Sequence, residues 1–173
     1  MQHITIVRED ITTLDCDAIV NAANHTLLGG GGVDGAIHRA AGPKLLDECR
    51  NLNGCNTGEA KITRGYNLPA RYVIHTVGPV YSGSDEDSIR LSDCYTNSLD
   101  LAREHSVHSI AFPAISTGVY GYPQEEAASV AYQTVRKWLK NNQDYDIEII
   151  FCCFDSHTQS LYSRLEEEAH NEL

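Results

Sequence analysis

Short apolar segments alternate with longer amphipathic segments along the whole chain. The short segments are rich in β-branched residues and have few polar positions, which is typical of strands buried on both faces of a parallel sheet. They cover residues 4–7, 18–20, 60–63, 72–77, 109–112 and 147–153. Because segments with a helical period separate them, the pattern predicts an α/β fold in which helices cover a mostly parallel sheet.

The amphipathic segments predict four helices. The clearest begins at Pro123, has acidic residues in its first turn and ends near Lys140, in agreement with the helix dipole. The last begins at Ser156, and Gln159 three residues later has the spacing of a capping box. The other two predicted helices cover residues 91–102 and 34–41.

The length of 173 residues favours one domain that spans residues 1–173, because a core of this size buries roughly 70% of the unfolded surface. Hydrophobic residues make up 42% of the chain, as in globular proteins, and we find no repeat, linker or low-complexity tract. Within this domain we expect the acidic stretch 82–87 to form an exposed loop and residues 166–168 to form a solvated helix face.

The chain is acidic, with 13 Lys and Arg against 24 Asp and Glu and a net charge of −11. Nonspecific binding to nucleic acids needs clustered Lys and Arg, so we expect no nucleic-acid partner. No apolar run approaches the roughly 18 residues of a membrane span, and the first residues do not resemble a signal peptide. These features predict a soluble, cytoplasmic protein without a membrane partner, and they leave the oligomeric state open.

Six cysteines are scattered along the chain without a Cys-x-x-Cys pair or the spacing of zinc ligands. They are Cys16, Cys49, Cys55, Cys94, Cys152 and Cys153. We expect reduced, mostly structural thiols, with a catalytic thiol as the less favoured alternative. The sequence therefore predicts no metal site.

Uncommon residues follow several of the predicted strands. In a parallel sheet with right-handed crossovers, the segments after the strands emerge at one edge, where ligands bind. These segments are Asn-Ala-Ala-Asn at 21–24, the glycine-rich 29–35, Gly-Pro at 78–79, 116–121 and Phe-Asp at 154–155. The sequence therefore predicts a ligand site at this edge of the sheet.

Segments 29–35 and 116–121 are glycine-rich loops that lead into helices. Runs of backbone N–H groups without a nearby Cβ can hold a diphosphate even in an acidic protein. Each such charge-assisted hydrogen bond contributes about 1.5–3 kcal/mol, so four or five outweigh the screened repulsion. The structural alternative is that these glycines only make tight turns.

Common nucleotide motifs do not explain these loops. Gly30, Gly32 and Gly35 have the spacing of the dinucleotide fingerprint, but nine residues separate them from the preceding strand. No acidic residue ends a second strand about 20 residues later. The chain also lacks a P-loop, a Gly-x-Ser-x-Gly elbow and a paired-histidine metal motif.

Four motifs in order carry a resemblance to a known family: NAAN at 21–24, GGGGVDGAIHRAAG at 29–42, HTVGP at 75–79 and ISTGVYGYP at 115–123. Together they resemble the macro domain, and within it the MacroD-type group that contains bacterial O-acetyl-ADP-ribose deacetylases. The resemblance covers residues 4–165. It implies a three-layer α/β/α fold that binds ADP-ribose in a cleft across the strand ends.

The resemblance also implies roles for individual residues. Asp10 would accept a hydrogen bond from the adenine amino group beside the backbone of Ile11, and Phe154 would pack on the adenine face. The implied diphosphate contacts are Ser116, Thr117, Gly118, Val119 and Tyr120, and the implied contacts to the distal ribose are Asn24, Gly32, Val33 and Asp34.

Asp34 and Asn24 are the implied catalytic residues. Asp34 would position or deprotonate the attacking water, and Asn24 would align the ribose. Each has a structural alternative: Asp34 as the N-cap of a helix over 35–41, and Asn24 as an Asx-turn residue after a strand. The sequence alone does not decide between the catalytic and the structural roles of these two residues.

Three further side chains need an interpretation. Tyr120 lies in a loop between glycines and is expected to shape the ligand pocket. His38 is four residues after Asp34 and so on the same helix face, where it could orient the carboxylate, although a packed or solvent-facing role is favoured. His75 ends an apolar strand and is expected to be a core histidine rather than a catalytic base.

Some positions depart from the family pattern. Glu9 stands before Asp10 where glycine is common, which affects the approach of the backbone to adenine. His25 and Asn56 replace residues that are often small or proline. None of these changes is at the implied reacting centre.

The implied reaction is hydrolysis of an ester on the distal ribose. The bond is either an acetyl ester on a ribose hydroxyl or the link from the anomeric carbon to a protein Glu or Asp. The implied partners are ADP-ribose, O-acetyl-ADP-ribose and ADP-ribosylated proteins, with no cofactor and no metal. The alternatives are a non-catalytic ADP-ribose reader, which needs no carboxylate at the reacting ribose, and a phosphatase, for which the sequence offers no dedicated nucleophile.

Overall fold

The computed structural model describes residues 1–171, and within them six strands form one mixed sheet. The strands are β1 (Gln2–Arg8), β2 (Ala18–Ala22), β3 (Ala60–Arg64), β4 (Tyr72–Thr76), β5 (Ser109–Phe112) and β6 (Ile147–Cys153). Their order is β1-β6-β5-β2-β4-β3, and every neighbouring pair is parallel except β3 with β4. All six predicted strands are confirmed, with small differences at their ends.

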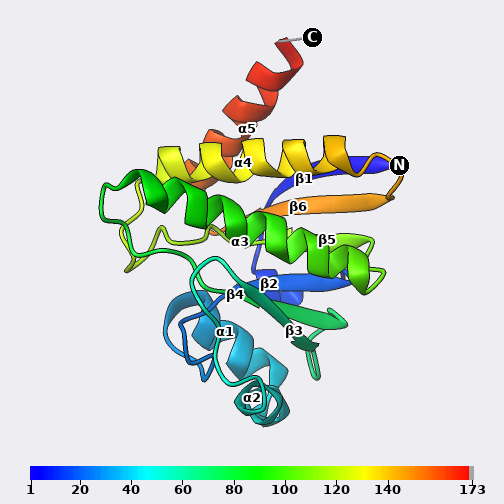
Figure 1. Ribbon diagram of the computed structural model, residues 1–173. Coiled ribbons are helices and arrows are strands. Elements are labelled where there is room, and N and C mark those ends of the chain that lie inside the picture. The colour runs from blue at the N-terminus through cyan, green and yellow to red at the C-terminus, as the bar shows by residue number, and fades with distance from the viewer. Residues whose placement is uncertain (172–173) are drawn as a thin grey trace.

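Helices cover both faces of this sheet (Figure 1). They are α1 (Gly32–Ala41), α2 (Pro43–Arg50), α3 (Asp85–Glu104), α4 (Gln124–Asn141), α5 (Ser156–Asn171) and the 3-10 turn η1 (Ile11–Thr13). Helices α3, α4 and α5 pack on one face, whereas α1, α2 and η1 pack on the other. The predicted three-layer α/β/α architecture is confirmed.

The central strands are apolar because two cores cover them. In β2, Val20 packs with the α3–α5 layer and Ile19 with the α1–α2 layer, and both are fully buried. In β4, Ile74 and Val73 divide between the same two layers. Since alternate side chains point to opposite faces, a continuous apolar run is the expected pattern for such a strand.

Helix α5 begins at Ser156 as predicted, but its cap differs from the prediction. Ser156 is the first helical residue, and the Oδ1 atom of Asp155 accepts a hydrogen bond from the backbone N–H of Thr158 at 2.8 Å. This hydrogen bond also lowers the pKa of Asp155. The predicted capping box at Ser156 is therefore wrong, because an aspartate one residue earlier caps the helix and faces its positive end.

The acidic stretch 82–87 is only partly a loop. Helix α3 starts at Asp85, after Ser84 has capped it by accepting from the N–H of Glu86 at 3.2 Å. Asp87 is buried and accepts from the backbone N–H groups of Ser82 at 2.8 Å and Gly83 at 2.9 Å. Acidic side chains are favoured in the first helical turn, which explains why the helix extends into this stretch.

The sequence did not predict α2. Pro43 lies in the first turn of α2, where its fixed φ and missing N–H are tolerated. Gly42 separates α1 from α2 with a φ of +87°, which a side chain would disfavour. Helix α1 also begins at Gly32, two residues before the predicted start.

All six cysteines are free and buried. Burial raises the pKa of Cys16 to about 12 and that of Cys94 to about 11, so both are protonated thiols at neutral pH. The structural interpretation of these residues is confirmed. Within residues 1–171, no helix combines the length and apolarity that a membrane crossing requires, and no cluster of His, Cys, Asp and Glu is arranged to hold a metal ion.

Candidate active site

The parallel strands all end at one edge of the sheet, at the left of Figure 1, and the predicted site residues follow these ends. In sheet order, Asp10 follows β1, Phe154 follows β6, the loop 113–123 follows β5 and the loop 23–31 follows β2. Neighbouring strands are about 4.8 Å apart, so β1 and β2 are about 14 Å apart. The edge therefore presents a row of segments that suits an elongated ligand.

The loop between β5 and α4 presents a run of unpaired backbone amides. Among the hydrogen bonds within residues 1–171, none uses the N–H groups of residues 117–120. Two bonds close the loop beneath them, from Tyr122 N to Ser116 O and from Gly121 N to Gly118 O, both at 2.9 Å. Successive unpaired amides attract an anion, which agrees with the diphosphate role predicted for residues 116–120.

Ser116 determines the shape of this loop. Its backbone is left-handed, with a φ of +68°, and its side chain is buried. The Oγ atom has no hydrogen-bond partner in the described part of the chain, and it packs so close to Gly78 that no side chain fits at that position. Gly78, which follows β4, therefore supports the loop that follows β5.

The N-terminus of α1 supplies the second set of amides. No hydrogen bond between described residues uses the N–H groups of residues 30–34. Gly31 is the N-cap, and no side chain caps the helix. Because the helix dipole adds positive potential at these amides, they form a second place for an anionic or hydroxylated group, beside the predicted ribose contacts Gly32 and Val33.

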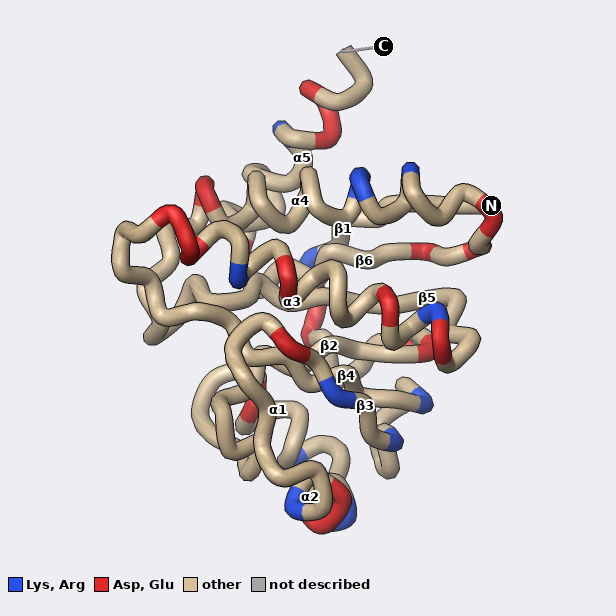
Figure 2. The backbone as a smooth tube through the Cα atoms, viewed as in Figure 1, with Lys and Arg blue, Asp and Glu red and all other residues tan. Residues whose placement is uncertain are grey.

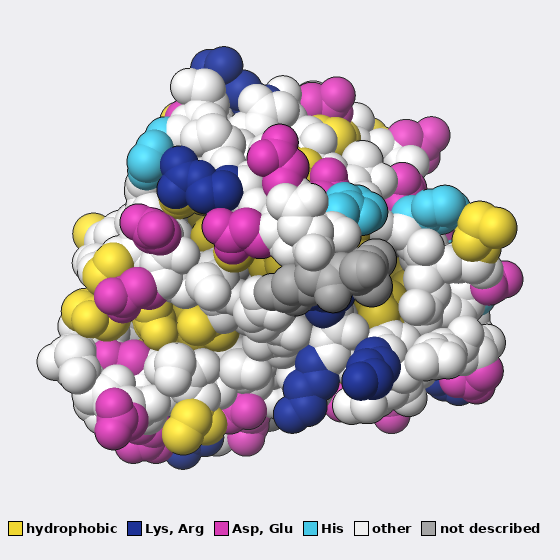
Figure 3. All heavy atoms as spheres, turned by 90° about the horizontal axis from the view of Figure 1, so that it is seen from above, with side chains coloured by type: hydrophobic (Ala, Val, Ile, Leu, Met, Phe, Trp, Pro, Cys, Tyr) yellow, Lys and Arg dark blue, Asp and Glu magenta, His cyan; other side chains and the backbone are white. Residues whose placement is uncertain are grey.

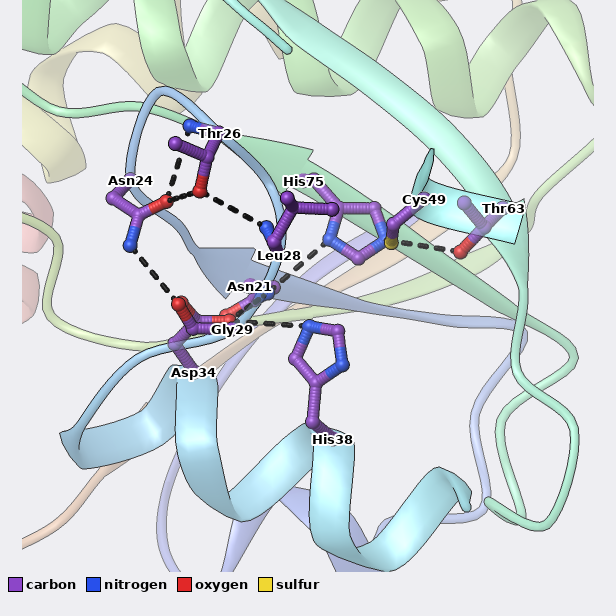
Figure 4. Close-up of polar contacts among 10 residues, drawn as sticks. All are labelled: Asn21, Asn24, Thr26, Leu28, Gly29, Asp34, His38, Cys49, Thr63 and His75. Atoms are coloured by element: carbon purple, nitrogen blue, oxygen red, sulfur yellow. Dashed lines mark hydrogen bonds and ion pairs between the residues drawn. The ribbon is translucent and has the colours of Figure 1, made fainter. Parts of the chain in front are cut away.

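Asp34 lies in the first turn of α1 and is 4% exposed. Its Oδ1 atom accepts a hydrogen bond from Asn21 Nδ2 at 2.9 Å and is 3.4 Å from His38 Nε2 (Figure 4). Burial raises the pKa of Asp34, while the Asn21 hydrogen bond and the charge of His38 act in the opposite direction. The N-cap alternative is excluded, because Gly31 is the cap and Asp34 makes no capping bond. A buried carboxylate with a raised pKa has the properties of a general base.

Asn24 holds the loop that approaches Asp34. Its Oδ1 atom accepts from Thr26 N at 3.1 Å and from Thr26 Oγ1 at 2.7 Å, and its Nδ2 atom donates to Gly29 O at 3.0 Å. The Asx-turn interpretation is therefore confirmed. A Cβ on Gly30 would lie 3.3 Å from Asn24 Nδ2 and 3.1 Å from Asp34 Oδ2, so the structure brings both predicted catalytic side chains together around Gly30.

Asn21 was assigned no role from the sequence, although it is the first residue of the NAAN motif. Asn21 is fully buried and contacts both Asp34 and His75 (Figure 4). His75 is also fully buried, as predicted, and desolvation lowers its pKa to about 3. His38 is packed against Asp34 with 14% of its side chain exposed, so it is not solvent-facing.

The stability of the protein should depend on pH through His75. The pKa of His75 falls from 6.5 in the unfolded chain to about 3 in the folded protein, so only the unfolded chain takes up this proton between those values. The contribution to stability is complete above pH 6.5 and is lost as pH falls toward 3. Near pH 5, denaturant titrations should show a loss of about 1.4 kcal/mol per pH unit from this group. A His75→Asn variant should lack this part of the slope, and an unchanged slope would contradict the assignment.

The adenine end of the row is open. Phe154 is 94% exposed, whereas Ile11 in η1 is buried. Asp10 caps η1 by accepting from Thr12 N at 3.0 Å and from Thr12 Oγ1 at 2.7 Å, both through Oδ1. Its Oδ2 atom is left for a ligand, so the predicted adenine contact is sterically compatible with the capping role. The carbonyl of Glu9 accepts from Cys152 Sγ at 3.2 Å, which fixes the backbone at this departure from the family pattern.

Charged side chains do not form a cationic clamp at this edge. Figure 2 shows acidic positions spread over the fold and no gathering of Lys and Arg at the left-hand edge of the described chain. The face in Figure 3 likewise has acidic and basic side chains interspersed. The anion would therefore be held by main-chain donors.

Two cavities flank the site. A small one of about 10 Å³ lies beneath the β5–α4 loop and is lined by Thr117, Tyr95 and Tyr162 among others. An open one of about 490 Å³ is lined by residues that include His25, Asn56 and Arg90. His25 and Asn56, which depart from the family pattern, therefore line this open cavity. They do not line the surroundings of the Asp34 carboxylate.

The fold and the two sets of unpaired amides are typical of a domain that binds a phosphorylated ligand. The sequence identifies the family of this domain, because the macro domain family model matches residues 20–131. The chain belongs to the macro domain family. The resemblance drawn from the four motifs is thereby confirmed.

Several relatives are similar over most of this chain. A macro domain-containing protein of Ralstonia nicotianae is 60% identical over 164 residues, which cover 94% of each chain. The human ADP-ribose glycohydrolase MACROD2 is 55% identical over 96% of this chain, which spans only 40% of the length of that protein.

Two solved structures have the same fold. The Oceanobacillus iheyensis macrodomain with ADP has a TM-score of 0.91 and 44% identity, over 97% of this chain and 92% of that one. The Trypanosoma brucei macrodomain in complex with ADP-ribose has a TM-score of 0.90 and 48% identity, over 95% of this chain and 69% of that one.

Proposed function

We propose that this protein is a hydrolase that binds ADP-ribose and removes ester-linked groups from its distal ribose. The observation that carries the proposal is the position of Asp34, a buried carboxylate in the same helical turn as unpaired amides. The relatives named ADP-ribose glycohydrolases and the solved macrodomains with ADP and ADP-ribose support this ligand and this class of reaction.

The ligand is proposed to lie along the row of strand ends. Adenine packs against Phe154 with its amino group toward Asp10, and the diphosphate accepts hydrogen bonds from the amides of residues 116–120. The distal ribose then lies at the β2 end, beside Asn24, Gly32 and Val33. This order follows the order β1, β6, β5, β2 of the strands that carry these residues.

Asp34 acts at the distal ribose. As a carboxylate it accepts a proton from a water molecule, and the oxygen of that water attacks the acyl carbonyl of an acetyl ester. Acetate and a ribose hydroxyl are then released. In the link to a protein Glu or Asp, the water instead attacks the anomeric carbon, the bond from that carbon to the ester oxygen breaks, and the protein carboxylate leaves. General-base assistance contributes typically 10²–10⁴-fold, and alignment of water and ester contributes more.

The second candidate is a non-catalytic reader of ADP-ribose. A reader needs the amide loops and the adenine contacts, but it gains nothing from burying a carboxylate at the ribose, where desolvation disfavours the charge. Asp34 therefore favours the hydrolase. The extent of the domain over residues 1–173 and a cytoplasmic location remain predictions, the latter supported by six free thiols that suit a reducing compartment.

Mass spectrometry of parallel incubations tests the function. The protein is incubated with O-acetyl-ADP-ribose and with a protein that carries Glu-linked ADP-ribose, and both products are followed over time. We expect free ADP-ribose from the first substrate and loss of the ADP-ribosyl mass from the second. If both substrates persist at stoichiometric protein while ADP-ribose still binds, the protein is a reader.

The rate of hydrolysis should depend on pH through Asp34. Burial raises the pKa of this carboxyl above 3.8, so it becomes protonated at a higher pH than an exposed aspartate. Since the base must be ionised, kcat should be constant at high pH and should fall as pH decreases through this raised pKa. A pH–rate profile that stays flat down to about pH 4, where exposed aspartates titrate, would remove Asp34 as the base.

A further inference from the structure

Asn21 and His75 are paired across β2 and β4, and both side chains point toward α1 (Figure 4). Asn21 Nδ2 is 2.9 Å from Asp34 Oδ1 and 3.2 Å from His75 Nδ1. On the far side of the ring, His75 Nε2 is 2.9 Å from Thr63 Oγ1 on β3. A continuous chain of contacts therefore leads from Thr63 through His75 and Asn21 to Asp34.

The contacts of Thr63 favour a proton on Nε2 of His75. Thr63 Oγ1 lies 3.1 Å from Arg64 O and 2.9 Å from His75 Nε2, so a hydroxyl that donates its single proton to Arg64 O accepts from His75 Nε2–H. The ring is neutral, because full burial keeps its pKa near 3. A neutral imidazole has one N–H, so Nδ1 carries a lone pair and faces Asn21 as an acceptor.

The lone pair on Nδ1 in turn fixes the amide of Asn21. Only the NH₂ group can donate to both His75 Nδ1 and the carboxylate of Asp34, and the other amide atom, Oδ1, is buried without a partner among the described residues. With the proton on Nδ1, the amide would turn its oxygen toward both groups. That oxygen repels a carboxylate and accepts from a protonated Asp34, so the amide would then favour the inactive acid form.

We propose that His75 is a positioning residue, whose Nδ1 lone pair keeps the Asn21 amide donating to Asp34 and thereby keeps Asp34 ionised and oriented for attack at the distal ribose. This inference rests on the proposed function for its catalytic consequence. The titratable groups that face this network are His38 on α1, 3.4 Å from Asp34, and Cys49 on α2, 3.8 Å from His75 Nε2. Neither contacts the Asn21 amide.

The first measurement is the tautomer of His75 in the unmodified protein, by ¹⁵N NMR of the ring nitrogens between about pH 5.5 and 8. We expect a neutral ring with its proton on Nε2 throughout. A proton on Nδ1, or a charged ring in this range, overturns the proposal. This result needs no variant and no turnover.

Two amide variants separate positioning from packing. In His75→Asn the side-chain oxygen can occupy the place of Nδ1 and accept from Asn21, whereas in His75→Gln the amide reaches the place of Nε2 and contacts Thr63 instead. We expect His75→Asn to keep kcat within about threefold of the parent and His75→Gln to lose at least about tenfold in kcat. The Kd for ADP-ribose should be nearly unchanged in both.

The carboxyl of Asp34 gives a readout that a packing role would not change. By ¹³C NMR of labelled aspartates, assigned with Asp34→Asn, the pKa of Asp34 should rise in His75→Gln and stay near the parent value in His75→Asn. Leu45→Ala is the matched control, since Leu45 is fully buried in the same α1–α2 core layer and should lower stability without moving this pKa.

Equal losses of kcat in the two amide variants, or an unchanged Asp34 pKa in His75→Gln, would assign His75 to packing and overturn the proposal. If neither variant folds, the tautomer of the parent decides. If the parent turns over no substrate, the proposed function fails, while the tautomer and the Asp34 titration still decide the role of His75.

Discussion

Replacing Asp34 with alanine is expected to slow hydrolysis of O-acetyl-ADP-ribose at least about tenfold and to leave the Kd for ADP-ribose within about threefold. The carboxylate is the base for the attacking water, whereas the ligand is held by main-chain donors of two loops, which the substitution does not touch. Steady-state kinetics and titration calorimetry on the same preparation measure the two quantities. Equal rates in the variant and the parent would remove Asp34 from the mechanism.

Asp34→Asn separates charge from shape. It preserves the volume of the side chain but cannot take up a proton, so it should be as slow as Asp34→Ala. Because burial disfavours the charged form of Asp34, the asparagine variant should also be more stable than the parent at neutral pH. Asp47→Ala is the matched control, since Asp47 is an exposed acid on α2 whose partner is Arg50. It should change neither rate nor affinity.

Gly118→Glu is expected to weaken ADP-ribose binding at least about hundredfold, because a carboxylate beside two phosphates costs several kcal/mol where solvent screening is incomplete. A Cβ on Gly118 would meet nothing within 4 Å, so the side chain extends into the open space that we assign to the diphosphate. The fold should tolerate the change, and thermal unfolding should show a midpoint close to that of the parent.

Two further variants separate the effect of side-chain size at position 118 from the effect of charge. Gly118→Ala should bind nearly as well as the parent, because the position has room for a methyl group. Gly118→Gln has a side chain of the size of glutamate without its charge. Its affinity for ADP-ribose should lie between those of Gly118→Ala and Gly118→Glu. Calorimetry gives the three affinities, and an unchanged affinity for Gly118→Glu would mean that the diphosphate lies elsewhere.

The strands and layers were predictable because burial on both faces leaves a continuous apolar run, as in Ile19 and Val20 of β2. The ends of the helices were harder to predict from the sequence. Asp155 and Ser156 are both good caps, and only the observed N–H of Thr158 decides between them. Helix α2 was not predicted because it starts at Pro43, and proline can either end one helix or start another.

The sequence was enough to predict the location of the candidate site at one edge of the sheet. It was not enough to predict the hydrogen-bond network within the site. Glycines and polar residues after successive strands located the two loops, because parallel strands end together. The link from Asn21 to His75 could not be inferred, since it depends on β2 and β4 pairing in register although β3 lies between them in sequence. The burial of Asp34 likewise arises from packing between α1 and the sheet.

The central claim is that backbone amides of two loops hold the diphosphate in an acidic protein. A crystal structure of the protein soaked with ADP-ribose at saturating concentration tests it most directly. We predict that the diphosphate accepts hydrogen bonds from the N–H groups of residues 117–120, with the distal ribose beside Asp34 and adenine against Phe154. ADP-ribose bound at another surface, or an empty edge at saturation, would contradict the claim.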